Sequence, residues 1–145
     1  MENVQDKLME QFQNMDRAYE AYAKAKGMNY LSLLVLEELW ELGDGCTQKQ
    51  ISAETHYPKQ AVNLVIKAFV QEGLVELREV PSNRKNKEIY CTAAGQQRCK
   101  EVVVPLLEQE NAAMAAMGEA QSRELLRLLE LYGRQYCAGV ERILK

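Results

Sequence analysis

The sequence has few of the residues that metal sites, disulfide frameworks and membrane segments require. It contains one histidine, four cysteines and three prolines. The cysteines form no C-x-x-C pair and the histidine has no companion ligand, so a zinc site is not expected. No apolar run approaches the ~20 residues that span a bilayer, and the start MENVQDKLMEQF lacks the features of a signal peptide. We therefore expect a cytoplasmic chain with reduced thiols, no membrane partner and no cofactor.

Sequence signatures of catalysis are also missing. We find no nucleophile–base set, no P-loop, no dinucleotide-binding fingerprint and no paired metal ligands. The length of 145 residues, with 47% hydrophobic and 27% charged residues, is typical of one globular domain that buries a core. The composition therefore favours a binding protein over an enzyme.

The strongest functional signal lies in residues 47–92, which predict two short helices followed by a β-hairpin. Thr47 and Gln50 form a capping-box pair, so the first helix begins there. Pro58 opens the second helix, because its missing N–H costs nothing at a helix start. Gly73 follows the end of that helix, where a left-handed residue is common. This order of elements is that of a helix-turn-helix.

The second helix, about residues 58–72, has an apolar face and a polar face. The apolar face repeats at helical spacing and is expected to pack inward. The polar face carries no acidic residue, and its amides and lysines could contact base edges or phosphates in the major groove. For this helix alone, an ordinary solvated face is the alternative. The inward residues are Val62, Val65, Ile66 and Phe69, and the polar residues are Lys59, Gln60, Asn63 and Lys67.

The hairpin has a basic tip. Residues 74–79 and 87–91 alternate like strands, and the residues between them are predicted to form a loop. Arg84, Lys85 and Lys87 cluster at this tip, where they would contact phosphate or the minor groove beside a helix that reads the major groove. Two helices followed by a basic hairpin make a winged helix-turn-helix, a combination far more specific than any of its parts.

The net charge of −3 at first argues against a polyanionic partner, but the charges are unevenly distributed. Residues 47–92 hold seven basic and five acidic side chains, whereas the rest of the chain holds eleven basic and sixteen acidic ones. A basic segment on an acidic body is compatible with binding double-stranded DNA. Because the basic excess is small, we expect affinity to depend on dimerisation and shape as well as on charge.

Long apolar stripes at both ends of the chain predict a homodimer. Residues 4–26 and about 120–144 form helices with apolar residues at steps of three and four. Residues 28–43 are apolar nearly all round, so this helix is expected at the centre of the core. Thr92 begins a further long helix. Pro105 should either kink this helix or break its ladder of backbone hydrogen bonds. The simplest way to cover the stripes is for the terminal helices of two copies to interleave.

Two sequence patterns resemble the MarR family of winged helix-turn-helix transcriptional regulators. PKQAVNLVIKAFVQEGLV is similar to the family's recognition helix, and Asn-Arg-Lys followed by KEIYCTAAG is similar to its wing motif, which ends in Leu-Thr-x-x-Gly. The resemblance covers nearly the whole chain. It implies a mainly α fold with a small β-hairpin wing, in a single domain of residues 1–145. Dimerisation helices would occupy residues 1–27 and 93–145, and the winged helix-turn-helix residues 28–92.

Three positions depart from the family's pattern. Asn83 stands where the family usually has an acid that pairs with an arginine and steadies the wing. Cys91 replaces the leucine that precedes the threonine of the wing motif. Leu64 occupies a recognition-helix position that is often arginine, and this change would alter sequence reading.

The resemblance implies a homodimeric regulator, usually a repressor, that binds a palindromic operator. One recognition helix would enter each of two successive major grooves, with half-sites ~10 bp apart. A winged-helix protein–protein interaction module is the alternative from another functional class. The residues expected to contact DNA are Gln48, Lys49, Pro58, Lys59, Gln60, Ala61, Asn63, Lys67, Asn83, Arg84, Lys85 and Lys87.

Members of this family are often released from DNA by a small phenolic or hydrophobic ligand, or by cysteine oxidation. For a thiol-based redox-sensing regulator, Cys46 and Cys99 are the best candidates, and core packing is the alternative role of the cysteines. A small-molecule effector would bind between the reading module and the dimer helices. The residues that could line such a pocket, or simply pack in the core, are Met15, Tyr19, Tyr22 and Trp40.

Overall fold

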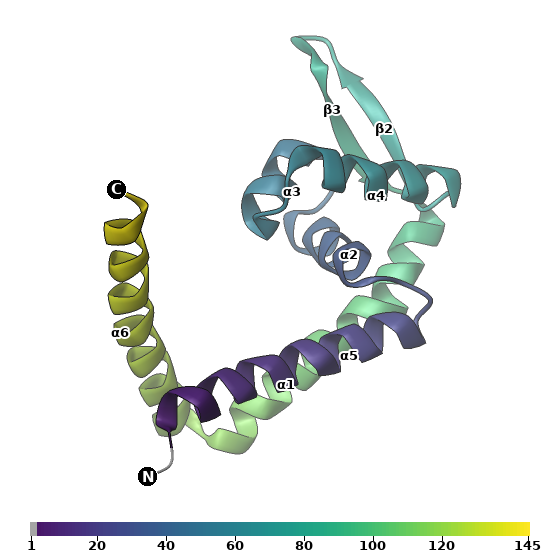
Figure 1. Cartoon of the computed structure of the whole chain (residues 1–145). Coiled ribbons are helices and arrows are strands. Elements are labelled where there is room, and N and C mark those ends of the chain that lie inside the picture. Colours follow the sequence, from purple (N-terminus) through teal and green to yellow (C-terminus); the bar gives the residue numbers. More distant parts are fainter. Residues whose placement is uncertain (1–2) are drawn as a thin grey trace. The chain divides into compact units, whose positions relative to one another are not determined.

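The structure, a computed structural model, describes residues 3–145, and for Arg84 it describes the backbone alone (Figure 1). The chain forms two units, one ending at Val104 and one beginning at Pro105, and each is described by itself. The predicted fold class, mainly α with a small β-hairpin wing, is confirmed. The elements are α1 (Val4–Ala25), α2 (Tyr30–Leu42), β1 (Cys46–Thr47), α3 (Gln48–Thr55), α4 (Lys59–Gln71), β2 (Val75–Val80), β3 (Asn83–Cys91), α5 (Ala93–Met117) and α6 (Glu119–Leu144).

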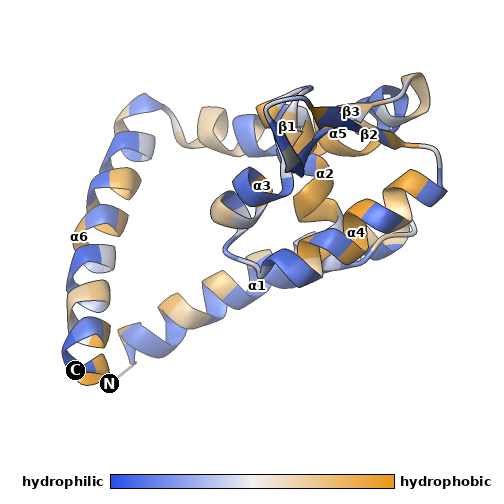
Figure 2. Ribbon diagram, turned by 90° about the horizontal axis from the view of Figure 1, so that it is seen from above, coloured by the Kyte–Doolittle hydropathy of each residue, from blue (hydrophilic) through white to orange (hydrophobic). Residues whose placement is uncertain are grey.

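Helix α2 is the centre of the first unit, as its sequence predicted. Leu33 and Val35 have no exposed surface, and Leu36 and Leu39 are almost completely buried. The helix contacts α1, α3 and α4, and Figure 2 shows that it is apolar along most of its length. Because each buried side chain of this size stabilises the fold by roughly 1.5–3 kcal/mol, α2 anchors the helices around it.

Helices α3 and α4 form the predicted helix-turn-helix. The side chain of Thr47 accepts a hydrogen bond from the backbone of Gln50, and the Gln50 side chain accepts one from the backbone of Thr47, so both bonds of the capping box are present. His56 ends α3 in the left-handed conformation, with φ of 61°. Pro58 is the N-cap of α4, so this helix begins one residue later than predicted. The predicted inward residues Val62, Val65, Ile66 and Phe69 are all buried.

The wing belongs to a three-stranded sheet of order β1-β3-β2. The short strand β1, which the sequence did not predict, pairs Cys46 with Ile89 and so attaches the start of α3 to the wing. The predicted loop over residues 80–86 is wrong in extent, because β2 continues to Val80 and β3 already begins at Asn83. These two residues pair across the turn. Strand pairing therefore reaches closer to the tip of the hairpin than the alternating sequence pattern does.

The Thr-x-x-Gly pattern that follows the wing has a structural cause. The Thr92 hydroxyl donates a hydrogen bond to the carbonyl of Gly73 at 2.6 Å and accepts one from the backbone N–H of Gly95 at 3.0 Å. A Cβ atom on Gly95 would lie 1.9 Å from the carbonyl oxygen of Leu74. Only glycine therefore allows the start of α5 to approach the end of α4 this closely.

The second unit contains the rest of α5 and the whole of α6. Helix α5 continues through Pro105 as one helix, although the missing N–H of this proline removes one bond from the ladder. Gly118, with φ of 83°, separates α5 from α6. Among the described residues of α6 none is buried, and Figure 2 shows apolar and polar residues alternating along it. The predicted organisation of residues 1–145 as one domain with terminal dimerisation helices stays a prediction.

None of the helices in the described part of the chain is both long enough and apolar enough to span a membrane.

Candidate nucleic-acid interface

A groove of about 380 Å³ lies between the helix-turn-helix and the wing. Helices α3 and α4 form one side of it and the two wing strands form the other. Of the described residues that line it, five are lysines and none is acidic. The lining residues are Thr47, Gln48, Lys49, Lys59, Asn63, Lys67, Leu77, Lys85, Asn86 and Lys87.

The two helices are linked inside this groove by a side-chain hydrogen bond. Asn63 Nδ2 donates to Gln48 Oε1 over 3.1 Å. Asn63 is half-buried, whereas Lys59 and Lys67 on the same side of α4 are exposed. The bond holds the Asn63 amide in one orientation and leaves its carbonyl oxygen and second N–H available. These two groups are the pair that can bond an adenine edge.

The lysines of the wing are placed by the alternation of strand β3. Residues two apart in a strand share a face, so Lys85, Lys87 and Ile89 point to one side of the sheet. Ile89 is buried and its cross-strand partner Leu77 is half-buried. The same face is therefore apolar where it covers the core and basic where the hairpin extends past the core.

The opposite face of the wing carries a basic residue that is already paired. Arg78 Nη2 lies 2.6 Å from Glu76 Oε1, and the Arg78 guanidinium lies 3.9 Å from the centre of the Tyr90 ring. Its charge is thus partly balanced within the wing. Arg78 therefore does not add to the basic groove on the other face.

The predicted DNA-contacting residues divide into two groups. Seven line the groove: Gln48, Lys49, Lys59, Asn63, Lys67, Lys85 and Lys87. Pro58, Gln60 and Asn83 are exposed outside the lining, and Ala61 is half-buried. The Asn83 carboxamide accepts a hydrogen bond from the backbone N–H of Lys85 at 3.3 Å, so it shapes the hairpin turn. The Arg84 side chain lies outside the described residues.

Sequence reasoning missed three residues that line the groove: Thr47, Leu77 and Asn86. Thr47 was recognised as a helix cap, and Leu77 as a strand residue, but nothing in the sequence placed them beside lysines of another element. Asn86 was assigned to a loop. Strand alternation places Asn86 on the face opposite Lys85 and Lys87, so extending the strand to Asn83 would not have predicted that Asn86 lines the groove.

The residues predicted to line an effector pocket lie in different surroundings. Tyr19 Oη donates to Glu37 Oε2 at 2.7 Å, and Tyr22 Oη donates to the carbonyl of Val102 at 2.6 Å. Burial raises the pKa of the Tyr22 phenol, so the phenol keeps the proton that it donates. Met15 is exposed. Trp40 lines a hollow of about 170 Å³, and Cys91 and Cys99 are among the other residues that line it.

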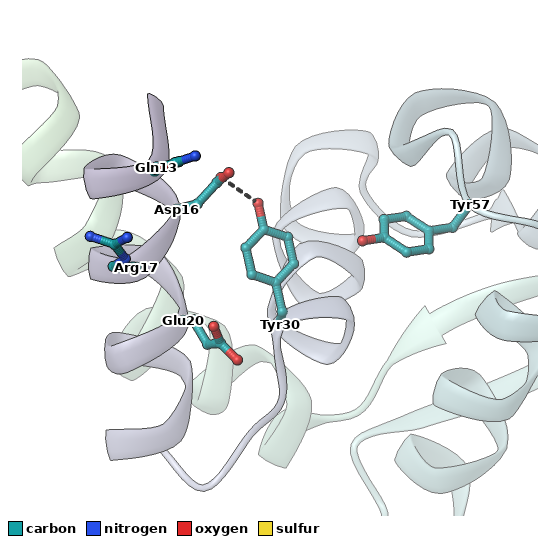
Figure 3. A pocket seen from close by; sticks show the side chains of 6 residues that line it. All are labelled: Gln13, Asp16, Arg17, Glu20, Tyr30 and Tyr57. Atoms are coloured by element: carbon teal, nitrogen blue, oxygen red, sulfur yellow. Dashed lines mark hydrogen bonds between the residues drawn. The ribbon is translucent and has the colours of Figure 1, made fainter. Parts of the chain in front are cut away.

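A second hollow, of about 470 Å³, lies beside the middle of α1 (Figure 3). Tyr30 Oη donates to Asp16 Oδ1 at 3.1 Å across it, and Figure 3 shows the Tyr57 ring on the far side of Tyr30 from α1. Its rim carries charges of both signs. The lining residues are Gln13, Asp16, Arg17, Glu20, Tyr30 and Tyr57.

The two cysteines predicted as oxidation candidates are both buried. Burial raises the pKa of the Cys46 thiol to about 11. Cys99 shares a hydrogen bond with Cys91, which raises the pKa of Cys99 and lowers that of Cys91. Cys91 is only half-buried. Because the thiolate is the reactive form, Cys91 is better suited to react than Cys46 or Cys99.

Comparisons with known proteins agree with this geometry. The model of the MarR family matches residues 26–85, which run from the end of α1 into the wing. A comparison with curated proteins gives no match. Among solved structures, the MarR family regulator NMB1585 from Neisseria meningitidis has a TM-score of 0.79 at 22% identity, and the alignment covers 97% of this chain and 99% of that chain.

Two further similar structures contain DNA. The S. aureus MepR–DNA complex has a TM-score of 0.73 at 13% identity, with 94% of this chain and 99% of that chain covered. A mutant MarR from E. coli complexed with operator DNA has a TM-score of 0.66 at 18% identity, with 88% and 91% covered. At these identities the likeness is one of fold. The family model matches the helix-turn-helix and part of the wing, and the chain has the winged helix-turn-helix fold of the MarR family structures.

Proposed function

We propose that this chain is a DNA-binding transcriptional regulator that acts as a homodimer. The observation that carries the proposal is the groove between α3, α4 and the wing, in which five lysines and no carboxylate are found among the described lining residues. Such a site attracts a polyanion, and it lies where a helix and a hairpin can contact a duplex together. The MepR and MarR complexes with DNA, which share the fold, support this use of it.

In this proposal α4 enters the major groove. Lys59 and Gln60 are exposed in its first turn and Asn63 follows in the second, and residues near the N-terminus of a recognition helix are the ones that contact base edges. Lys85 and Lys87 on the wing would contact the backbone or the adjacent minor groove, as the sequence predicted. The lysines supply sequence-independent affinity, whereas the amides supply base contacts.

The dimer is proposed from α6. Leu125, Leu128 and Leu129 are 37%, 47% and 38% exposed, and Tyr136 is 62% exposed. These residues follow one helical stripe, and a contiguous apolar stripe of this length on a helix requires a partner surface. A second copy of the chain, related by a twofold axis, would cover it and present two recognition helices to a palindrome with half-sites ~10 bp apart. Binding of this kind at a promoter usually represses transcription.

We also propose that a small phenolic or hydrophobic ligand releases the regulator from DNA. The hollow that contains Trp40 supports this idea, because it combines apolar side chains and two cysteines with the polar Asp44 and Gln96 next to the base of the wing. A ligand acts only if it binds better to the geometry that no longer fits two grooves. A thermal-shift series with phenolic compounds tests it, since a ligand that prefers the folded state must raise the melting temperature. Unchanged melting at saturating concentrations contradicts the ligand proposal.

The DNA proposal is tested by salt-dependent binding to a random duplex pool and to duplexes selected from it. Lys59→Ala and Lys85→Ala should each weaken binding to all sequences and reduce the slope of log K against log salt by about 0.9 for each phosphate that the variant no longer neutralises. Lys100→Ala is the matched control, because Lys100 is an exposed lysine outside the groove. Equal effects of all three variants would contradict the assigned groove, and no binding at low salt would contradict the function.

A further inference from the structure

One residue of α4 is exposed although it is apolar. Leu64 is 69% exposed, and among the described residues up to Val104 only Val4 is a more exposed large apolar side chain. The inward face of α4 is complete without it, since Val62, Ile66 and Phe69 are already buried. Leu64 therefore has no packing role within its own unit.

The position of Leu64 on the helix makes this exposure specific. At 100° per residue, residues 60, 64 and 67 lie on one face, opposite the buried residues. Leu64 is therefore flanked by Gln60 one turn earlier and by Lys67 one turn later, both exposed. An isolated leucine at the centre of a polar face is suited to contact an apolar group that is itself surrounded by polar ones.

The major groove offers one such group. Each base edge there presents hydrogen-bond donors and acceptors, and only thymine adds an apolar C5-methyl group. A leucine cannot bond the polar edges, and covering them would leave them unsatisfied. Resting on the proposed DNA-binding function, we propose that Leu64 is a specificity-determining residue that packs on the methyl group of a thymine in each half-site.

The helix geometry also places this thymine relative to a second contact. Residues 60 and 64 are separated by ~6 Å along the helix axis, and base pairs are stacked ~3.4 Å apart. Gln60 is of the type that bonds adenine bidentately. The inferred half-site therefore contains an adenine read by Gln60 and a thymine about two base pairs away.

The surroundings of Leu64 favour DNA over a protein partner. The face that carries it adjoins the groove with five lysines, and the first turn of α4 contains no acidic residue. An apolar side chain close to several lysines is complementary to a DNA duplex. The phosphates on the outside of the duplex are anionic, and the thymine methyl group lies inside the major groove. Docking of a protein on Leu64 would depend instead on an apolar pocket in that partner.

The test removes the methyl group without changing any hydrogen bond. Duplexes selected by the wild-type chain from a random pool are resynthesised with deoxyuridine in place of each thymine, one position at a time. Wild-type affinity should fall about fourfold at one thymine per half-site, which is the factor expected for exposing one buried methyl group. Leu64→Ala should bind the thymine duplex more weakly and lose less than about 1.5-fold on the same replacement.

Two controls keep the result specific. Leu64→Met keeps a long apolar side chain and should retain most of the preference for thymine over deoxyuridine. Gln60→Ala should weaken DNA binding but should retain the same preference. If wild type and Leu64→Ala lose the same factor at every deoxyuridine position, the inference about Leu64 is overturned while DNA binding stands. If the wild-type chain enriches no duplex from the pool, the proposed function itself fails. If Leu64→Ala instead abolishes capture of a protein and leaves DNA affinity unchanged, the thymine contact is refuted.

Discussion

The two units of this chain differ most in what they bury. Every buried side chain among the described residues lies between Ala23 and Val103, whereas α6, which makes up most of the second unit, buries none. The winged helix-turn-helix thus rests on a core of its own, built around α2. The second unit presents apolar residues of α6 to solvent. The proposed contact with DNA and the proposed pairing with a second copy are therefore assigned to different units.

Charging the stripe of α6 should produce the largest effect. Leu125→Glu combined with Leu129→Glu would place four carboxylates in the interface of a symmetric dimer, and each buried unpaired charge costs several kcal/mol. We expect the dimer to weaken by about 4 kcal/mol or more, or roughly a thousandfold, as measured by sedimentation equilibrium. Glu130→Lys, on the other side of the helix, should leave the dimer intact. A dimer that survives the double change would show that α6 is not the interface.

Leucine truncation separates buried from exposed positions inside the first unit. Leu33 has no exposed surface, so Leu33→Ala should lower the free energy of unfolding by about 3–5 kcal/mol. Leu64, at 69% exposed, is the matched control, and Leu64→Ala should change stability by less than about 0.5 kcal/mol. Urea unfolding followed by circular dichroism measures both. Similar losses for the two variants would mean that Leu64 is covered in solution.

Two helical glycines extend the comparison across the units. A Cβ at Gly95 in α5 would lie 1.9 Å from the Leu74 carbonyl oxygen, whereas a Cβ at Gly133 in α6 meets nothing within 4 Å. Gly95→Ala should therefore destabilise the fold by about 3 kcal/mol. Gly133→Ala should stabilise α6 by about 1 kcal/mol, as measured by thermal melting. A destabilising Gly133→Ala would instead reveal close approach of a second copy at that point.

Alkaline pH should affect the first unit through Cys46. Burial raises the pKa of this thiol from 9.0 to about 11, so the unfolded chain loses the proton at a lower pH than the folded one. The contribution of the neutral Cys46 thiol to stability is fully present below pH 9 and is lost as pH rises through 11, for a total of up to about 3 kcal/mol. Urea unfolding between pH 8 and 11 should show a shallower decline for Cys46→Ala. Cys137→Ala, which alters an exposed thiol of α6, should keep the wild-type decline.

Local patterns predicted the helices well because their signals are local. The capping pair at Thr47, the stripe of α4 and the glycines at 73 and 118 each act through neighbours within one turn. The strands were predicted less well. Strand β1 has only two residues, too few for any alternation, and the extent of β3 depends on bonds to β2 rather than on its own polar composition.

The candidate interface was predicted in part. The lysines of α4 and of the wing were named from the sequence, and the groove brings them together. The hydrogen bond between Asn63 and Gln48 joins residues of different helices, and no spacing rule anticipates it. The thiol pair of Cys91 and Cys99 was missed for the same reason, because a residue's burial and its partners depend on how distant segments pack.

The amino-acid order by itself determined the kind of protein this is, namely helices with defined faces, a basic hairpin and apolar stripes at both ends. Side-chain period and capping chemistry act over three or four residues, so they can be read without coordinates. Only the tertiary structure decided that five lysines share one groove and that Leu64 stands uncovered on the reading helix. Both depend on which surfaces of distant segments meet, and that depends on the packing of the whole core.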